Sequence, residues 1–297
     1  MSYAKEVLMV DPAGFRFNPE TGQDNYFMSA KAGSDISVYA REEFDRLKYL
    51  LEENGMRVSL FKIEDNLDTP DAVFPNNWFS THPDGRLVIY PMKAPSRRLE
   101  RRSHIIDFLK SRYSVVHDFS RNEDRGLYLE GTGSIVMDHD ARIAWAALSE
   151  RTSTNLLYEW GKKLNYSLIL FSSDDEQRRS IYHTNVMMCL GPGFAILCTD
   201  SIRDSDEKRL VKKSITESGR TIIEISMEQM KNFCGNCLAL ENDKKEKLLI
   251  MSSRAHSAFS SEQIIILERH CRIIHTELST FETLGGGGAR CMIAELF

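Results

Sequence analysis

The chain ends in the stretch Leu284-Gly-Gly-Gly-Gly-Ala-Arg-Cys291-Met-Ile-Ala-Glu-Leu-Phe297, in which four glycines lead into a cysteine and an apolar strand. Because glycine has no side chain, a substrate or another backbone can approach closely along such a run. A cysteine at the edge of the run is a candidate nucleophile. The alternative is a buried cysteine that packs as a small hydrophobic side chain.

Hairpin starts similar to this one recur along the chain at nearly equal spacing. Before Arg290-Cys-Met come Asn236-Cys-Leu, Asn185-Val-Met, Gly133-Ser-Ile and Asn77-Trp-Phe. Five units of about 53 residues are the signature of a closed radial repeat. The sequence therefore predicts an α/β fold, a five-fold pseudosymmetric β/α-propeller, formed as a single domain by residues 1–297.

Each unit is predicted to contain a hairpin, a helix and a further strand. The hairpins are expected at 74–90, 127–147, 184–199 and 236–251, the helices at 34–54, 95–113, 152–164, 204–218 and 260–271, and the further strands at 57–63, 114–119, 167–171, 221–225 and 273–278. Ser34-Asp35 is the expected cap of the first helix, and Ser260–Gln263 a capping box. The last unit lacks its second hairpin arm, so we expect the N-terminal strand, at Val7–Val10, to supply it and close the ring.

Composition narrows the function classes. Hydrophobic residues make up 42% and charged residues 27%, which is ordinary for a globular protein. A net charge of -5 provides no basic footprint for nucleic acid. The start of the chain has no apolar leader core, and no apolar run approaches a membrane span. Six cysteines in such a chain predict reduced thiols and a cytoplasmic location.

Polar residues near the other hairpin starts can meet Cys291, because the five starts converge on one end of the ring axis. Glu130 lies before the second start and His183 before the third. A thiol nucleophile needs a group that moves protons and a carboxylate that orients it. The pattern predicts such a site, whereas a strand-edge histidine and a capped turn residue are the alternatives for His183 and Glu130.

At these residues the sequence resembles the guanidino-group-modifying, or pentein, superfamily of β/α-propeller enzymes. The closest resemblance is to a bacterial branch of citrulline-utilisation hydrolases and amidinotransferase-like proteins related to arginine deiminase, and it covers nearly the whole chain. The matching pieces are Pro75-Asn-Asn-Trp-Phe-Ser-Thr-His-Pro83, Pro91-Met92, Pro95-Ser-Arg-Arg98, Glu130-Gly-Thr-Gly133, Ser149-Glu-Arg-Thr152, His183-Thr-Asn185 and Gly286-Gly-Gly-Ala-Arg-Cys-Met292.

The resemblance implies a hydrolase without cofactor or metal that forms a covalent intermediate on Cys291. It implies that His183 protonates the leaving amine and then activates water, and that Glu130 binds a substrate nitrogen and supports His183. Arg97 and Arg151 match arginines that hold the substrate α-carboxylate, a task that suits a planar guanidinium fork. An exposed basic helix face is the alternative for Arg97.

Three further residues bear on the substrate. Asn76 matches a residue that contacts the amino-acid end. Arginine deiminases carry aspartates where this chain has His82 and Asn185, and losing two carboxylates disfavours a cationic group in a dry pocket. Asn185 can both donate to a ureido oxygen and accept from its nitrogen. We therefore expect citrulline as the substrate, with ornithine, ammonia and CO2 as products.

Other interpretations remain open. His82 is either a second proton carrier or a turn residue, and Asp71 could partly replace a lost carboxylate. An arginine deiminase-type hydrolase, an amidinotransferase and a non-catalytic pentein binding protein are the alternative functions, and the oligomeric state is left open between monomer and homodimer. We expect the Cys234-x-x-Cys237 pair to be structural, and Asp138-His139-Asp140 to form a solvated hairpin tip.

Overall fold

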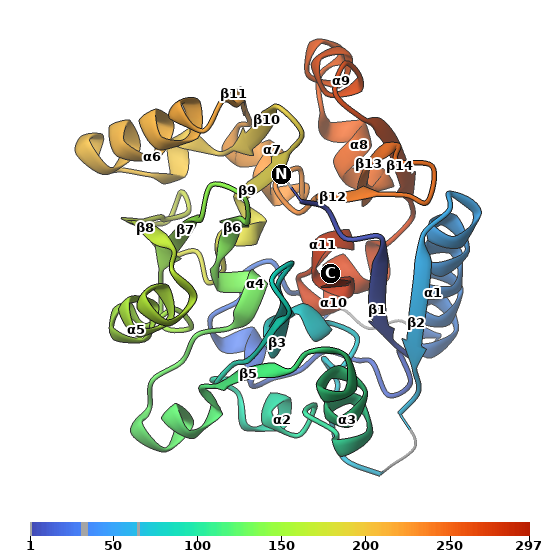
Figure 1. The fold of residues 1–297 in the computed structure, drawn as a ribbon. Helices are drawn as coiled ribbons and strands as arrows, with labels where there is room; N and C mark the ends of the chain where they lie inside the picture. Colours follow the sequence, from blue (N-terminus) through green and yellow to red (C-terminus); the bar gives the residue numbers. More distant parts are fainter. Residues whose placement is uncertain (1, 31–34, 64–65) are drawn as a thin grey trace.

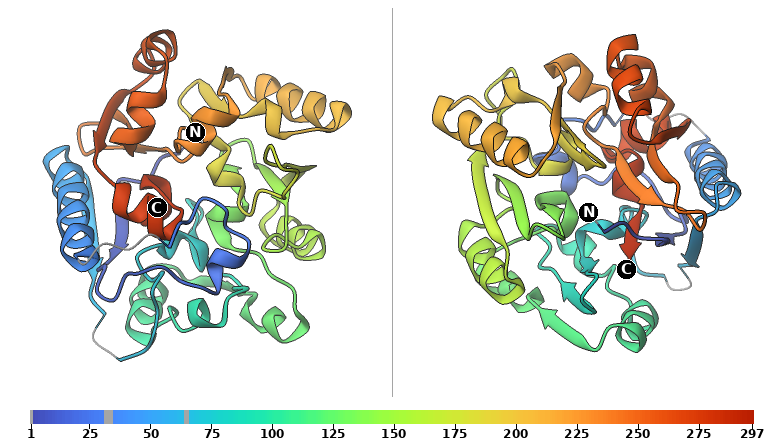
Figure 2. Two further views of the ribbon diagram at one scale, coloured as in Figure 1. Left: turned by 180° about the vertical axis from the view of Figure 1, so that it is seen from behind. Right: turned by 45° about the horizontal axis from the view of Figure 1, so that its top comes forward.

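The computed structural model describes residues 2–30, 35–63 and 66–297. Within these ranges the strands form five three-stranded sheets, arranged as a ring with the longer helices on its outside (Figure 1). Both ends of the chain lie near the middle of the ring (Figures 1 and 2). The predicted five-fold α/β propeller is confirmed.

The helices and strands have the following bounds. The strands are β1 (Glu6–Val10), β2 (Arg57–Phe61), β3 (Phe79–Thr81), β4 (Arg86–Ile89), β5 (Val115–Asp118), β6 (Val136–Asp138), β7 (Ile143–Leu148), β8 (Ser167–Ser172), β9 (Met188–Gly191), β10 (Phe194–Leu197), β11 (Thr221–Glu224), β12 (Leu238–Glu241), β13 (Lys247–Ser252), β14 (Arg272–Thr276) and β15 (Ala294–Leu296). The α-helices are α1 (Ile36–Glu53), α2 (Pro95–Arg98), α3 (Ser103–Arg112), α4 (Gly131–Ser134), α5 (Thr154–Leu164), α6 (Ser205–Glu217), α7 (Met227–Lys231), α8 (Ser253–Ala258), α9 (Ser261–Glu268), α10 (Ser279–Gly285) and α11 (Ala289–Met292). Short 3-10 turns are η1 (Thr21–Gln23), η2 (Pro75–Asn77), η3 (Ser120–Arg125), η4 (Thr184–Val186) and η5 (Thr199–Ser201).

All five sheets have the same topology. The middle strand pairs antiparallel with an inner strand and parallel with an outer strand, as β4 does with β3 and β5. The parallel pairing requires a crossover, and a helix such as α3 supplies it on the outside of the ring. Neighbouring inner strands pack against one another, for example β6 against β9 and β9 against β12. The repeat therefore places the same part of each unit at the axis.

Pairing between the two ends of the chain closes the ring. In the last sheet β1 pairs antiparallel with β15, with Leu8 opposite Ala294, and parallel with β2. The N-terminal strand thus supplies the missing second arm, as predicted. Val7, Leu8 and Met9 of this strand are fully buried, so closing the ring also buries apolar surface at the seam.

Some local predictions differ from the structure. The helix expected over 95–113 is two helices, α2 and α3, because Arg102 is extended between them. The short helix α8 was not predicted; the Ser252 side chain caps it. The Ser260–Gln263 capping box is confirmed, whereas Ser34, half of the expected cap of the first helix, lies outside the described residues.

The prediction of a solvated hairpin tip at Asp138–Asp140 is confirmed for Asp140, which is exposed, and wrong for Asp138 and His139. Asp138 and His139 are buried, Asp138 against Arg220 of the next unit and His139 against Tyr166 of its own unit. Arg220, just before β11, forms an ion pair with Asp138 at 2.7 Å between Nη2 and Oδ2. Tyr166 covers His139, with 2.7 Å between its hydroxyl and Nδ1.

Among the described helices, none combines the length and the apolar character that crossing a membrane requires.

The seam makes a testable prediction about stability. Leu8 is fully buried in β1, so Leu8→Ala should lower the free energy of unfolding by about 2–5 kcal/mol in urea titrations. Leu210→Ala, on the exposed face of α6, is the matched control and should change it by less than about 0.5 kcal/mol. Equal effects of the two substitutions would contradict a structural role for the seam.

Candidate active site

Short helical turns at the hairpin starts gather around one end of the axis. The turn α4 packs against η2 and η4, and α11 packs against η2. Each turn carries one of the polar segments singled out in the sequence, so residues from distant units meet. The Gly133 backbone shows how closely they approach, because a Cβ there would lie 2.6 Å from His183 Nδ1 and 2.5 Å from Asn77 Nδ2.

A cavity at this end of the axis is lined by Cys291 and His183, together with Arg97, Arg151 and Asp71. His183 precedes η4, and its Nε2 lies 2.9 Å from Oε2 of Glu130, the residue before α4. The structure therefore brings together the sulfur, the imidazole and the carboxylate that the repeat argument assigned to one site. All three side chains are buried.

The glycine run lets the chain pass between the nucleophile and neighbouring side chains. Gly286 has a φ of 63°, in the left-handed region, and a Cβ there would lie 2.4 Å from Asn25 Nδ2. A Cβ on Gly287 would lie 2.9 Å from Cys291 Cβ. Neighbouring atoms therefore approach the backbone too closely at these two positions for any residue with a Cβ, as the sequence analysis inferred for the glycine run.

Burial and charge set the protonation states. Burial lowers the pKa of His183 below its ordinary value of 6.5, although Glu130 opposes this. Burial alone would raise the pKa of Glu130, but Arg151 and His183 outweigh it and hold that pKa well below its usual range. Burial also raises the pKa of Cys291 above 9.0. At neutral pH the resting site thus contains a neutral thiol, a neutral imidazole and an ionised carboxylate.

Both arginines reach the cavity, but protein carboxylates already occupy their forks. Arg97 donates from Nε and Nη2 to Glu100 at 2.9 and 3.0 Å, and from Nη1 to Asn77 Oδ1 at 2.6 Å. Arg97 is therefore buried and not part of an exposed basic face. Arg151 pairs with Asp24 and donates from Nη2 to the Thr21 carbonyl at 2.8 Å. The expected bidentate grip on a substrate carboxylate would require these pairs to rearrange.

The amide side chains are arranged differently from the prediction. Asn76 does not line the cavity: its Nδ2 donates to Thr132 Oγ1 at 3.2 Å. Its neighbour Asn77 lines the cavity instead, because successive residues of the turn η2 point in different directions. Asn185, predicted to bind the ureido group, does not line the cavity either, and its Nδ2 lies 3.7 Å from Cys291 Sγ.

The structure does not bring His82 into this cavity. It follows β3, so the length of that strand separates it from η2. Its Nε2 lies 3.0 Å from Ser80 Oγ, and its ring packs edge-on against His139. Burial holds the pKa of His82 well below 6.5, which keeps the ring neutral. His82 was predicted to be either a second proton carrier or a turn residue, and its buried position after β3 matches the turn residue.

Asp71 reaches the cavity, where two side chains already bind one of its oxygens. Asn18 Nδ2 and Thr21 Oγ1 donate to Oδ2 at 2.9 and 2.8 Å. Oδ1 is buried and finds no hydrogen-bond partner within the part of the chain that the structure describes. It is therefore an acceptor available to a ligand.

Sequence reasoning missed several residues of the site. Residues 18–28, for which the sequence analysis predicted no role, cover this end of the ring (Figure 2, left), and their Asp24 pairs with Arg151. Tyr182 packs its ring against the Arg151 guanidinium and donates to the Gly286 carbonyl at 2.7 Å. Asn236 donates to Cys291 Sγ at 3.3 Å. The repeat spacing marked Asn236 as a hairpin start, and that signal could have identified it.

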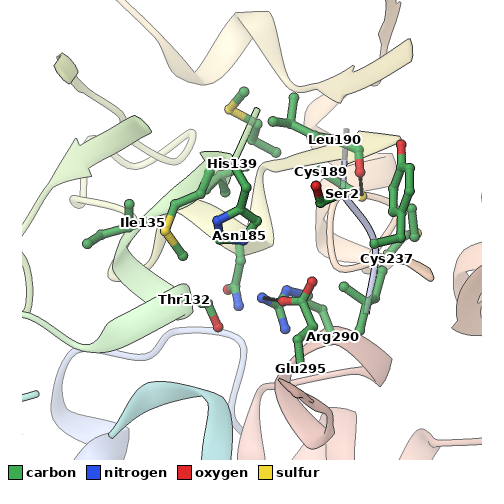
Figure 3. Close-up of a pocket in the computed structure, with 16 residues that line it drawn as sticks. Ser2, Thr132, Ile135, His139, Asn185, Cys189, Leu190, Cys237, Arg290 and Glu295 are labelled. Carbon is green, nitrogen blue, oxygen red and sulfur yellow. Dashed lines mark hydrogen bonds and ion pairs between the residues drawn. The ribbon is translucent and has the colours of Figure 1, made fainter. Parts of the chain in front are cut away.

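A second cavity lies beyond Asn185 and shares no lining residue with the first among the described residues. In it Asn185 points between Thr132 and Arg290, with Glu295 nearby (Figure 3). Arg290 Nη2 donates to Glu295 Oε2 at 2.8 Å, so the charges in this cavity are paired.

No group of three or more His, Cys, Asp or Glu side chains in the described ranges could hold a metal ion. Cys234 and Cys237 are buried free thiols, and burial raises the pKa of Cys234 to about 12.

Comparisons with known proteins identify a matching family and structures of similar fold. The family model for N,N-dimethylarginine dimethylhydrolase, eukaryotic, matches residues 11–297. No curated protein matches the sequence significantly.

Among solved structures, the apo arginine dihydrolase of the cyanobacterial ornithine–ammonia cycle superimposes with a TM-score of 0.77 at 20% identity, covering 97% of this chain and 40% of that one. The chain thus spans about two fifths of that enzyme. A variant of its N-terminal domain, covalently bound to a reaction intermediate, matches with a TM-score of 0.74 at 20% identity over 98% and 97% of the two chains. A dimethylarginine dimethylaminohydrolase variant, as an adduct with S-methyl-L-thiocitrulline, matches at 0.70 and 17% identity over 99% and 100%. These likenesses establish the fold.

The contact between Glu130 and His183 makes a prediction about the imidazole. Glu130→Gln removes the opposing negative charge, so the pKa of His183 should fall further, by about 1–3 pH units. NMR titration of histidine-labelled protein would measure it. Glu159→Gln, a half-exposed residue on α5, is the control. An unchanged or raised His183 pKa would show that Glu130 does not act on the imidazole.

Proposed function

The chain belongs to the N,N-dimethylarginine dimethylhydrolase family of the pentein superfamily, whose members hydrolyse guanidino C–N bonds, and from this premise we propose that it is a cysteine hydrolase of the ureido group of citrulline. In this proposal Cys291 is the nucleophile, His183 moves the protons and Glu130 orients His183. Arg97, Arg151 and Asp71 bind the amino-acid part of the substrate.

One observation carries the choice of substrate. Asn77 Nδ2 is buried at the cavity and finds no hydrogen-bond partner among the described residues. The bond from Arg97 Nη1 to Asn77 Oδ1 fixes the orientation of the amide, so an N–H group, and not an oxygen, is left for a ligand. A ureido oxygen accepts from that N–H, whereas a guanidinium carries only donors and would leave it unpaired.

The charges near the sulfur support the same choice. Glu130 is engaged by His183 and Arg151, and the two side chains that contact Cys291 Sγ are neutral amides. A cationic guanidinium is costly to bury without an anionic partner. A neutral ureido group carries no such penalty.

The neutral thiol and neutral imidazole of the resting site allow a reaction in which each proton has a donor and an acceptor. As Sγ attacks the ureido carbon, His183 accepts the thiol proton and passes it to the substrate Nε. The bond from Nε to the ureido carbon breaks, ornithine leaves, and a carbamoyl group remains on Sγ. Water then attacks with His183 as base, the thiol re-forms, and carbamic acid decomposes to ammonia and CO2. Glu130 stabilises the imidazolium that exists between proton transfers.

Arginine hydrolysis is the second candidate, and one observation favours it. The unpartnered Asp71 Oδ1 is an anionic acceptor at the cavity, and it would suit either the substrate ammonium group or a guanidinium. The arginine dihydrolase of similar fold acts on arginine. The two candidates predict opposite substrate preferences.

Substrate preference is the direct test. Purified protein should convert citrulline to ornithine and ammonia with a kcat/KM at least about 100-fold above those for arginine and dimethylarginine, because only the ureido oxygen pairs with Asn77. Cys291→Ser should lower the rate at least about 10³-fold and provides the blank.

Asn77→Asp is the matched variant, because it keeps the acceptor for Arg97 but replaces the donor. It should lower the preference for citrulline at least about tenfold. A wild-type protein that hydrolyses arginine far faster than citrulline would eliminate the proposed substrate.

The pH profile tests the proton carrier. Because burial lowers the pKa of His183 below 6.5 and raises that of Cys291 above 9.0, kcat/KM for citrulline should stay flat between these values. It should fall below pH 6.5 as His183 becomes protonated, and above pH 9.0 as the thiol proton is lost. Half-loss of activity inside the flat range would argue against a neutral thiol–imidazole pair.

A further inference from the structure

The amide side chains of two asparagines contact the sulfur of Cys291. Asn236 Nδ2 lies 3.3 Å from Sγ and Asn185 Nδ2 lies 3.7 Å from it. Both residues are at least 98% buried, and each stands at the hairpin start of its own unit. The ring therefore aims two N–H donors from neighbouring units at one atom.

The orientation of the Asn236 amide is determined by its other bonds. Its Oδ1 accepts from the Gly288 backbone N–H at 2.9 Å, and its Nδ2 also donates to the Asn185 carbonyl at 3.0 Å. A flipped amide would place oxygen against oxygen and N–H against N–H. The remaining N–H must therefore face the sulfur.

Asn185 separates the sulfur from the second cavity. Its Nδ2 faces Cys291, while its Oδ1 is buried and has no partner among the residues described. The side chain points into the second cavity (Figure 3). That cavity has both polar and apolar walls and about 50 Å³ of free space, which is enough for water to satisfy the Asn185 oxygen.

We propose that Asn236 and Asn185 form a thiolate cradle, a pair of neutral donors that stabilises the ionised sulfur of Cys291 during attack. This inference rests on the proposed function, because a neutral ureido group brings no positive charge to help the thiol ionise. Hydrogen bonds to an ionised acceptor are roughly twice as strong as those to a neutral one, so both amides favour thiolate over thiol. Asn236 and Asn185 touch the reacting atom and are catalytic residues in this sense.

The electrostatic setting agrees with this role. Burial raises the pKa of Cys291, and Asn236, Arg290 and Asn185 each act against that rise. Arg290 is already paired with Glu295, which leaves the two amides as the groups in direct contact with the sulfur.

The test is the pH dependence of Cys291 alkylation by iodoacetamide in substrate-free protein, with the modified residue identified by peptide mass spectrometry. Asn236→Asp keeps an acceptor for the Gly288 N–H but removes the donor to sulfur and adds negative charge. We expect the midpoint of the rate curve to rise by at least about one pH unit, and alkylation at about pH 8 to slow about tenfold. Asn185→Asp should act in the same direction but less strongly, because its contact is longer.

Asn242→Asp is the control for loss of a buried amide, since Asn242 lies at the distant β12–β13 hairpin tip and is 2% exposed. It should leave the midpoint unchanged even if it lowers Tm. Unchanged midpoints in both site variants, with or without a lower Tm, would overturn the cradle. If Asn236→Asp does not fold, Asn185→Asp decides, because its Oδ1 holds no described partner that the change could disturb.

The readout needs no substrate, so it separates this inference from the proposed function. A shifted midpoint in a protein that ignores citrulline would support the cradle and reject the substrate. Hydrolysis of citrulline by a protein whose site variants leave the alkylation midpoint unchanged would support the substrate and reject the cradle.

Discussion

Pairing of β1 with β15 is the constraint on which the rest of the structure depends. It joins the two ends of the chain into one sheet, and it turns five similar units into a closed ring. Only in a closed ring do the turns at the hairpin starts meet at one end of the axis. Residues more than 50 positions apart, such as Glu130 and His183, then come within hydrogen-bond distance.

Charge inside the ring is organised in pairs. Arg97 is held by Glu100 and Arg151 by Asp24, and Glu130 lies between Arg151 and His183. Because the charges compensate one another, the groups nearest the sulfur can be neutral. An ionisable nucleophile in such a setting depends on oriented dipoles, and amides supply these without adding net charge. This arrangement suits a neutral substrate group and connects the proposed substrate with the proposed cradle.

The covering segment 18–28 gives the site a further property. It supplies the Thr21 carbonyl and Asp24 to Arg151, and Asn25 donates to the Gly285 carbonyl at 3.3 Å. The arginine expected to hold the substrate carboxylate is therefore tied to the segment that covers the cavity. A substrate carboxylate that binds Arg151 would therefore compete with Asp24 and the Thr21 carbonyl for the same guanidinium.

The sequence by itself determined the five-unit ring, its closure by the N-terminal strand, and the grouping of Cys291, His183 and Glu130, because repeat spacing and strand patterns are properties of local sequence. It did not determine which way side chains point. The direction of short turns and the packing between units decide four features of the site. Asn77 lines the cavity instead of Asn76, and His82 lies outside it. Asn185 contacts the sulfur and not the ureido group, and Asn236 joins it there. Only the tertiary structure decides these features, because neighbouring residues of a short turn point in different directions, and only one of them faces the cavity.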